Sequence, residues 1–349
     1  MAEIRIRKPE KIVVPEMRSL GYRRWVENGA KILRKELPFE GAADLSITIE
    51  SDASSVLDFL KLNDIRHIPY ENIGLPIAQN QKHKKEIIAG ITSEGKKVII
   101  VNGRTRAYDI PEGGIATKRW GNLERMELAT GYLAMLNEIG VENMILTCVA
   151  DGINHPLHDD EVRPFEESNL PVISLIGADL NKAYPSPPMD HYKVKRGDFI
   201  GLKDADSDLM SMFKRSMVET GEKKEPPSVY YVTSPSTLSF KDRASIYDVA
   251  VNNGQVVGMS YSYEKEFIGG LENIGRFMGI AVVTNTVELV YINPFPYRTR
   301  KSISVQELRC KYPWEFKTVH PATDEEVQRV GRLANERLGK ALTQMTKHL

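Results

Sequence analysis

The sequence has little cysteine: two residues, Cys148 and Cys310, stand far apart in a chain of 349 residues. Two distant thiols exclude a disulfide framework and a cysteine-rich zinc site, and they fit a reducing compartment. The first residues, MAEIRIRKPEK, have no apolar core of the kind that a signal peptide needs. We therefore expect a cytoplasmic protein.

Long hydrophobic runs and an excess of either charge are also missing. The longest apolar runs, such as MGIAVV at 278–283, are far too short to cross a bilayer. The chain has 47 basic and 47 acidic residues, so its formal net charge is zero. No basic surplus would attract nucleic acid or a membrane surface. We therefore expect no nucleic-acid partner and no membrane. A balanced charge is typical of enzymes that bind small molecules, and of many other proteins.

What is present is an alternation of strand-like and helix-like segments, with 41% hydrophobic residues to build a core. The patterns predict helices over 21–37, 52–62, 124–140, 240–254, 269–279 and 324–345. They predict strands over 43–50, 143–150, 228–234, 255–260 and 280–285, and a hairpin over 84–91 and 96–103. Residues 153–193 are rich in proline and charge and read as an excursion, with one strand-like piece at 171–177.

This alternation predicts an α/β protein with a largely parallel sheet and helices on both faces. Ligands of such sheets bind beyond the carboxyl ends of the strands. Asp151, Met259 and Asn285 each come directly after an apolar strand. They are the candidate site residues on this argument alone.

Three ordered blocks resemble the trimeric purine nucleoside phosphorylases, a family that includes methylthioadenosine phosphorylases. They are KKVIIVNGRTRAYD, then VYYVTSPSTLSFKD with VVGMS, then GIAVVTNTVEL. The segment 21–51 also resembles the family's opening helix and first strand. The resemblance implies one nucleoside-phosphorylase-like domain over 1–349, with a mixed or mostly parallel twisted sheet and an insertion at about 153–193. It also implies a homotrimer, a nucleoside substrate, inorganic phosphate as co-substrate and no cofactor.

The resemblance implies a phosphate site of hydroxyl groups and cations, of the kind that holds a dianion. Its residues here are Ser51, His83, Arg104, Arg106 and Ser260. The loop at Ser51 departs from the family, because Glu50 and Asp52 replace glycines and their charge would repel phosphate. Arg106 replaces a histidine and would offset one acid. A retuned phosphate site, a site for another anion and a site that has lost phosphate all remain open.

The resemblance also implies contacts for the sugar and the base. Tyr108, Met259 and Asp324 would contact the ribose, with His320 as an alternative to Asp324. Phe240, Lys241, Thr284 and Asn285 would contact the base. Asn285 would donate to the purine as it leaves with negative charge, and would thereby stabilise the transition state.

Two departures bear on the chemistry. Lys241 stands where the purine-specific members have glutamate, and an ammonium has three donors and no acceptor. Asp151 stands where the family has glycine in a tight loop, and its carboxylate could activate water. The stretch HPLHDDE at 155–161 offers possible zinc ligands in His155, His158, Asp159 and Asp160. On a proline-rich excursion such a stretch reads as a polar loop, so we expect no metal.

The sequence therefore predicts a pentosyltransferase that cleaves or forms the N-glycosidic bond of a purine-like nucleoside by phosphorolysis. One alternative is a phosphate-independent nucleoside hydrolase on the same fold, which would use Asp151. The other is a catalytically silent homologue that binds a nucleotide-like ligand or a protein partner.

Overall fold

The structure is a computed structural model, which describes residues 19–49, 53–77, 84–105, 121–153, 172–179, 205–222, 225–226, 228–233, 256–259, 274–291, 314–320 and 324–349. The chain forms two compact units. Unit 1 comprises Met1–Ala53, Lys61–Met144 and Asn273–Gly275, and unit 2 comprises Ser54–Leu60, Ile145–Glu272 and Arg276–Leu349. Among the described helices, none has both the length and the apolar character that a membrane span requires.

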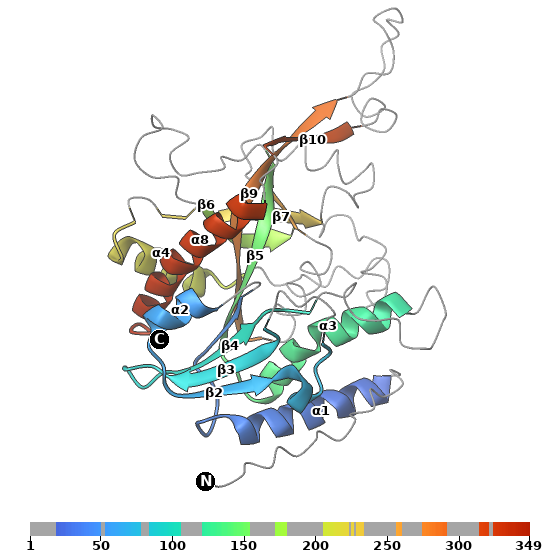
Figure 1. Cartoon of the computed structure of the whole chain (residues 1–349), viewed down its shortest axis with the longest axis vertical. Coiled ribbons are helices and arrows are strands. Elements are labelled where there is room, and N and C mark those ends of the chain that lie inside the picture. The colour runs from blue at the N-terminus through green and yellow to red at the C-terminus, as the bar shows by residue number, and fades with distance from the viewer. Residues whose placement is uncertain are drawn as a thin grey trace, which may run out of the picture. The chain divides into compact units, whose positions relative to one another are not determined.

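The sheet of unit 1 contains four strands in the order β1-β4-β3-β2 (Figure 1). They are β1 (Leu45–Ile49), β2 (Asn63–Pro69), β3 (Glu86–Ile91) and β4 (Lys97–Asn102). β1 is parallel to β4, whereas β3 is antiparallel to both β4 and β2. The predicted hairpin of β3 and β4 is confirmed, and β2 is a strand that the sequence patterns did not predict.

Two long helices pack together in unit 1, α1 (Ser19–Glu36) and α3 (Gly121–Glu138) (Figure 1). The buried indole of Trp25 lies against Gly131 of α3, and its Nε1 donates to the Gly74 carbonyl at 3.0 Å. Gly74 ends the short 3-10 helix η1 (Tyr70–Ile73). The helices predicted over 21–37 and 124–140 are confirmed.

Side chains fix the register of β1 and β4 at the amino end of β1. The Oδ2 of Asp44 accepts from the Lys97 backbone nitrogen at 2.7 Å, and the Asp44 nitrogen donates to the Lys97 carbonyl at 2.9 Å. The Nδ2 of Asn143 donates to the Asp44 carbonyl at 2.7 Å. The backbone groups just before β1 therefore have hydrogen-bond partners, although they lie beyond the ladder of β1 and β4.

Unit 2 contains a mixed six-stranded sheet in the order β10-β9-β6-β7-β8-β5 (Figure 1). The strands are β5 (Asn143–Ile153), β6 (Val172–Asp179), β7 (Ser228–Thr233), β8 (Val256–Met259), β9 (Arg276–Tyr291) and β10 (Trp314–His320). Because β9 also pairs with β5, the strands β9, β6, β7, β8 and β5 close into a ring. The predicted mixed α/β sheet is confirmed, and so is the strand inside the excursion at 153–193.

Two helices of unit 2, α2 (Ser54–Leu60) and α4 (Ser207–Glu219), pack on a third, α8 (Asp324–Met345). α8 contacts both other helices and β9, where Val330 and Ala334 form a buried cluster with Val282. The sequence predicted the bounds of α8 to the residue. The guanidinium of Arg337 binds Glu222 through two hydrogen bonds, at 2.8 and 2.6 Å, and so ties α8 to the end of α4.

Two predictions about β9 are wrong. The helix predicted over 269–279 does not form at Arg276–Gly279, because these residues begin β9. There the Phe277 carbonyl accepts from the nitrogen of Asp206, the N-cap of α4, at 2.8 Å, and Gly279 pairs with Ile176 of β6. The strand predicted to end at Asn285 continues to Tyr291, because β10 pairs with its second half. The helix predicted over 240–254 lies outside the described residues.

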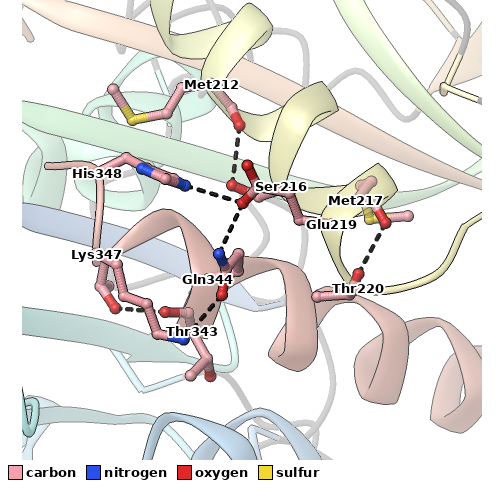
Figure 2. Close-up of polar contacts among 10 residues, drawn as sticks. Met212, Ser216, Met217, Glu219, Thr220, Thr343, Gln344, Lys347 and His348 are labelled. Carbon is pink, nitrogen blue, oxygen red and sulfur yellow. Dashed lines mark hydrogen bonds and ion pairs between the residues drawn. The ribbon is translucent and has the colours of Figure 1, made fainter.

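The ends of α4 and α8 are joined by polar contacts (Figure 2). The carboxylate of Glu219 contacts Nε2 of His348 at 2.9 Å and accepts from Nε2 of Gln344 at 2.7 Å. The hydrogen bond from His348, followed by that from Gln344, lowers the pKa of Glu219 below its usual value of 4.5. The ionised carboxylate is therefore the form that this junction favours.

We expect Gly131→Ala to destabilise the protein by about 1–3 kcal/mol, because the added Cβ would overlap the Trp25 ring. Gly331→Ala is the matched control, since a Cβ at Gly331 in α8 meets nothing within 4 Å. There the better helix propensity of alanine should stabilise by up to about 1 kcal/mol. Urea denaturation of both variants measures the difference, and equal effects would contradict the close packing of α1 on α3.

We expect the Glu219 carboxyl to titrate below pH 4.5 in the folded protein. Because the pKa is lowered, the contacts with His348 and Gln344 stabilise the fold at higher pH and are lost as the pH falls through the folded pKa. Carbon-detected NMR titration of the side chain measures this pKa. His348→Ala should raise it towards its usual value, and Gln344→Ala should raise it less. A pKa that His348→Ala leaves unchanged would exclude this cause.

Candidate functional site

The carboxyl ends of β1 and β4 hold both ends of the loop that contains Ser51. Where the chain leaves the sheet, the Ile49 carbonyl accepts from the Gly103 nitrogen at 2.8 Å. Where it returns, the Ala53 nitrogen donates to Oδ1 of Asn102 at 3.1 Å. Gly103 has φ of +80°, a left-handed conformation that favours glycine, directly before Arg104. The structure therefore brings the loop ends and Arg104 to one edge of the sheet.

Asn102 is part of a row of side chains across three strands. It is 1% exposed, and its Nδ2 donates to Oε1 of Glu86 at 3.0 Å. Asn102 and Glu86 are opposite one another in the register of β4 and β3. The second oxygen of Glu86, Oε2, is 3.0 Å from Nδ1 of His67 on β2. The row runs from an exposed histidine to the backbone of the loop at Ser51.

Two buried cations lie at the same edge. Arg104 is 2% exposed and Lys85 is 7% exposed. The Lys85 ammonium donates to the Arg104 carbonyl at 2.7 Å, and Lys85 itself has φ of +54°. Lys85 comes directly before β3, so the chain enters β3 at this edge. Thr105 donates through Oγ1 to the Pro76 carbonyl at 2.9 Å and fixes the chain beyond Arg104.

Of the predicted anion and sugar residues of unit 1, Arg104 is described. Ser51, His83, Arg106 and Tyr108 lie outside the described residues, so their contacts remain predictions. Ala53, Lys85 and Arg104, which stand two residues from Ser51, His83 and Arg106 in the sequence, have contacts at the carboxyl end of β4, and Lys85 and Arg104 are buried cations. An anion is the ligand that such an edge favours.

In unit 2, Asp151 and Met259 lie on neighbouring strands. Asp151 of β5 is opposite Gly258 of β8, and Met259 is opposite Thr233 of β7. The expectation that Asp151 follows its strand in a tight loop is wrong, because β5 continues to Ile153 by pairing with β8. The backbone of Asp151 thus lies within a sheet, one residue away in register from Met259.

Asn285 lies within β9, between the part of the strand that pairs with β6 and the part that pairs with β10. The register of β9 with β6 reaches Val283, and that with β10 begins at Thr286. Thr284 and Asn285 are the two residues between them. Asn285 is therefore within a strand, and the expectation that it terminates one is wrong.

The end of β10 is next to this point. His320 is opposite Thr286, and the register shifts between Thr318 and His320, as at a β-bulge. Asp324, the predicted ribose contact, is the first residue of α8. Of the two alternatives, His320 is thus the one that the backbone register places beside Asn285.

Several predicted positions of unit 2 lie outside the described residues. They are Phe240, Lys241, Ser260 and the histidines and acids of residues 155–160. Within the described part of the chain, no cluster of three or more metal-binding side chains is present.

The sequence patterns did not single out Lys85, Glu86, Asn102 or His67. A charged residue at the start of a strand is ordinarily solvated, and an asparagine at its end is ordinarily part of a turn. One signal was available for Asn102, because it immediately precedes the Gly-Arg pair that carries the resemblance.

We expect Lys85→Met to destabilise unit 1 by about 1.5–3 kcal/mol, because a buried carbonyl loses a charged donor. Lys97→Met is the matched control: the Lys97 ammonium also donates to a carbonyl, that of Glu40, at 2.7 Å, but in an exposed place. Its loss should cost less than about 1 kcal/mol. Urea denaturation measures the free energy of unfolding of both variants. Equal losses would show that burial of Lys85 does not strengthen the contribution of its hydrogen bond to stability.

Comparison with known proteins identifies this fold. No family model matches the chain, and no curated protein matches it either. Solved structures do. A Schistosoma purine nucleoside phosphorylase in complex with hypoxanthine is 17% identical, with a TM-score of 0.57. The Schistosoma mansoni enzyme in complex with inosine is 16% identical, with a TM-score of 0.58. Isoform 2 from the same organism, in complex with cytosine and ribose-1-phosphate, is 15% identical, with a TM-score of 0.59.

Each comparison covers 93% of this chain and 96% of the other. Agreement over almost the whole of both chains shows a shared fold, whereas identities of 15–17% leave the chemistry of the site open. The chain therefore has the fold of the purine nucleoside phosphorylases, as its ordered motifs predicted.

Proposed function

We propose that the protein cleaves or forms the N-glycosidic bond of a purine-like nucleoside by phosphorolysis. An oxygen of inorganic phosphate bonds to the anomeric carbon as the bond from that carbon to the base nitrogen breaks. The base leaves with the bonding electrons and takes up a proton, and a pentose 1-phosphate is the other product. One protein of this fold holds ribose-1-phosphate and a base in its solved structure.

One observation carries the proposal: the ends of the loop at Ser51 are fixed beside Arg104 and Lys85. Phosphate needs cations and hydroxyls held in place before it binds, because ordering them on binding would weaken the interaction. In this proposal Arg104, with Arg106, His83, Ser51 and Ser260, holds the phosphate. The two buried cations offset the acids Glu50 and Asp52.

The sugar and base contacts are part of the same proposal. Tyr108 and Met259 contact the ribose, and Asp324 or His320 contacts its 5′ end. Phe240, Lys241 and Thr284 contact the base, while Asn285 donates to the base as negative charge develops on it. Asn285 lies in β9 one residue before Thr286, which is opposite His320 in the register with β10, so the backbone of these two proposed contact residues is close together.

The oligomer and the domain organisation remain proposals as well. We propose a homotrimer of a single nucleoside-phosphorylase-like domain with an insertion at about 153–193, and inorganic phosphate as co-substrate without a cofactor.

We expect release of free base from a panel of purine nucleosides to require phosphate. Asn285→Ala should lower kcat by about 10²–10³, because it removes a donor to the leaving group. Arg104→Gln should instead raise the KM for phosphate. Chromatography of the base, with and without added phosphate, measures both. Lack of release from every nucleoside would contradict the proposal.

The same assay separates phosphorolysis from hydrolysis. A hydrolase that uses Asp151 would release base at a rate independent of phosphate and would lose it in Asp151→Asn. A phosphorylase would yield pentose 1-phosphate in an amount equal to the base.

A further inference from the structure

The backbone nitrogen of Ala53 has a side-chain acceptor where the parallel ladder of β1 and β4 has ended. The register of the two strands stops at the pair Ile49 and Asn102. Beyond it, the amide oxygen of Asn102 extends the hydrogen bonding to Ala53, at 3.1 Å. Both groups are buried, so this nitrogen would lose its partner if the amide were removed. The hydrogen bond of the Ala53 nitrogen, at the end of this loop, therefore depends on the side chain of Asn102.

Glu86 determines which way the Asn102 amide faces. The Ala53 nitrogen is a donor and needs the amide oxygen, whereas the Glu86 carboxylate is an acceptor and needs the amide nitrogen. The two partners lie on opposite sides of the same amide, at 3.1 and 3.0 Å. His67 contacts the other carboxylate oxygen, so Glu86 is itself held from both sides. The orientation of the amide is thus set by a three-strand row.

We propose that Asn102 is a positioning residue for the anion site, oriented by Glu86 and, through it, by His67. Asn102 does not contact the anion. It holds Ala53, which follows Ser51 by two residues, against the carboxyl end of β4, where Arg104 follows Asn102 by two residues. This inference rests on the proposed function, because it takes the loop to be the place where phosphate binds.

Unit 1 offers a matched control for Asn102. Asn143 is also a buried asparagine, 5% exposed, whose side chain bonds to the backbone beside β1. It does so at Asp44, at the amino end of the strand, away from the loop. Asn102→Ala and Asn143→Ala remove the same chemical group at comparable burial. A general loss of stability would weaken phosphate binding alike in both variants, whereas loss of a positioning role would weaken it in Asn102→Ala alone.

The experiment measures inorganic phosphate binding by calorimetry, together with amide hydrogen exchange of residues 49–60. Asn102→Ala should weaken phosphate binding by about tenfold, the effect of one buried hydrogen bond. It should also speed exchange at Ala53. Asn143→Ala should leave phosphate affinity within about twofold and exchange at Ala53 unchanged, even where both variants lose similar stability.

Two further variants test the role of Glu86. Glu86→Gln keeps an acceptor for the Asn102 amide and should retain phosphate affinity within about twofold. Glu86→Ala removes the acceptor and should weaken phosphate binding by about three- to tenfold. Equal affinities of these two variants would overturn the part assigned to Glu86.

The remaining outcomes separate this inference from the proposed function. An equal loss of phosphate affinity in Asn102→Ala and Asn143→Ala, or no loss in Asn102→Ala, would overturn the positioning role. Phosphate binding without base release from any nucleoside would contradict the proposed function and leave the positioning role standing. No binding of phosphate by the unsubstituted chain would overturn both.

Discussion

The hydrogen bond from Ala53 to the side chain of Asn102 is the contact on which the candidate anion site depends. The chain that connects two parallel strands leaves the sheet at one end and re-enters it at the other. The backbone groups just beyond the ladder therefore have no partners on the neighbouring strand. In unit 1 the side-chain amide of Asn102 and the backbone nitrogen of Gly103 supply hydrogen-bond partners at the carboxyl end of β1, and Asp44 supplies them at its amino end. β1 has five residues, and both of its ends are held in this way.

The charges of two buried cations explain how Glu50 and Asp52 can flank the proposed anion site. Glu50 and Asp52 replace glycines of the resembling family, and two carboxylates alone would repel phosphate. The structure adds a cation that the motifs did not indicate, because Lys85 is buried with its ammonium on the Arg104 carbonyl. An arginine and a lysine on adjoining chain segments supply two positive charges against two negative ones. The exchange of glycine for acid is therefore compatible with the proposed anion binding.

The sequence predicted the elements whose partners are close along the chain. The hairpin of β3 and β4 is local, and α8 has a helical pattern throughout its length, so both were found. β2 and β10 were missed, and the end of β9 was placed too early. β2 has few buried residues, which leaves little pattern to detect, and the second half of β9 depends on pairing with the distant β10. Such strands are specified by their neighbours more than by their own residues.

The same distinction applies to the site. Arg104 was singled out because a motif of contiguous residues contains it, and its role stays a prediction. Asn102, Glu86 and His67 were not, because they are connected by hydrogen bonds between residues 16 to 49 positions apart. Asp151 shows the opposite error: its motif implied a loop, but pairing with β8 keeps it in the sheet opposite Gly258. Glycine within a strand is typical of a place that another backbone or a ligand approaches closely. Asp151 is opposite that glycine and next in register to Met259, so its backbone belongs to the sheet and not to a loop.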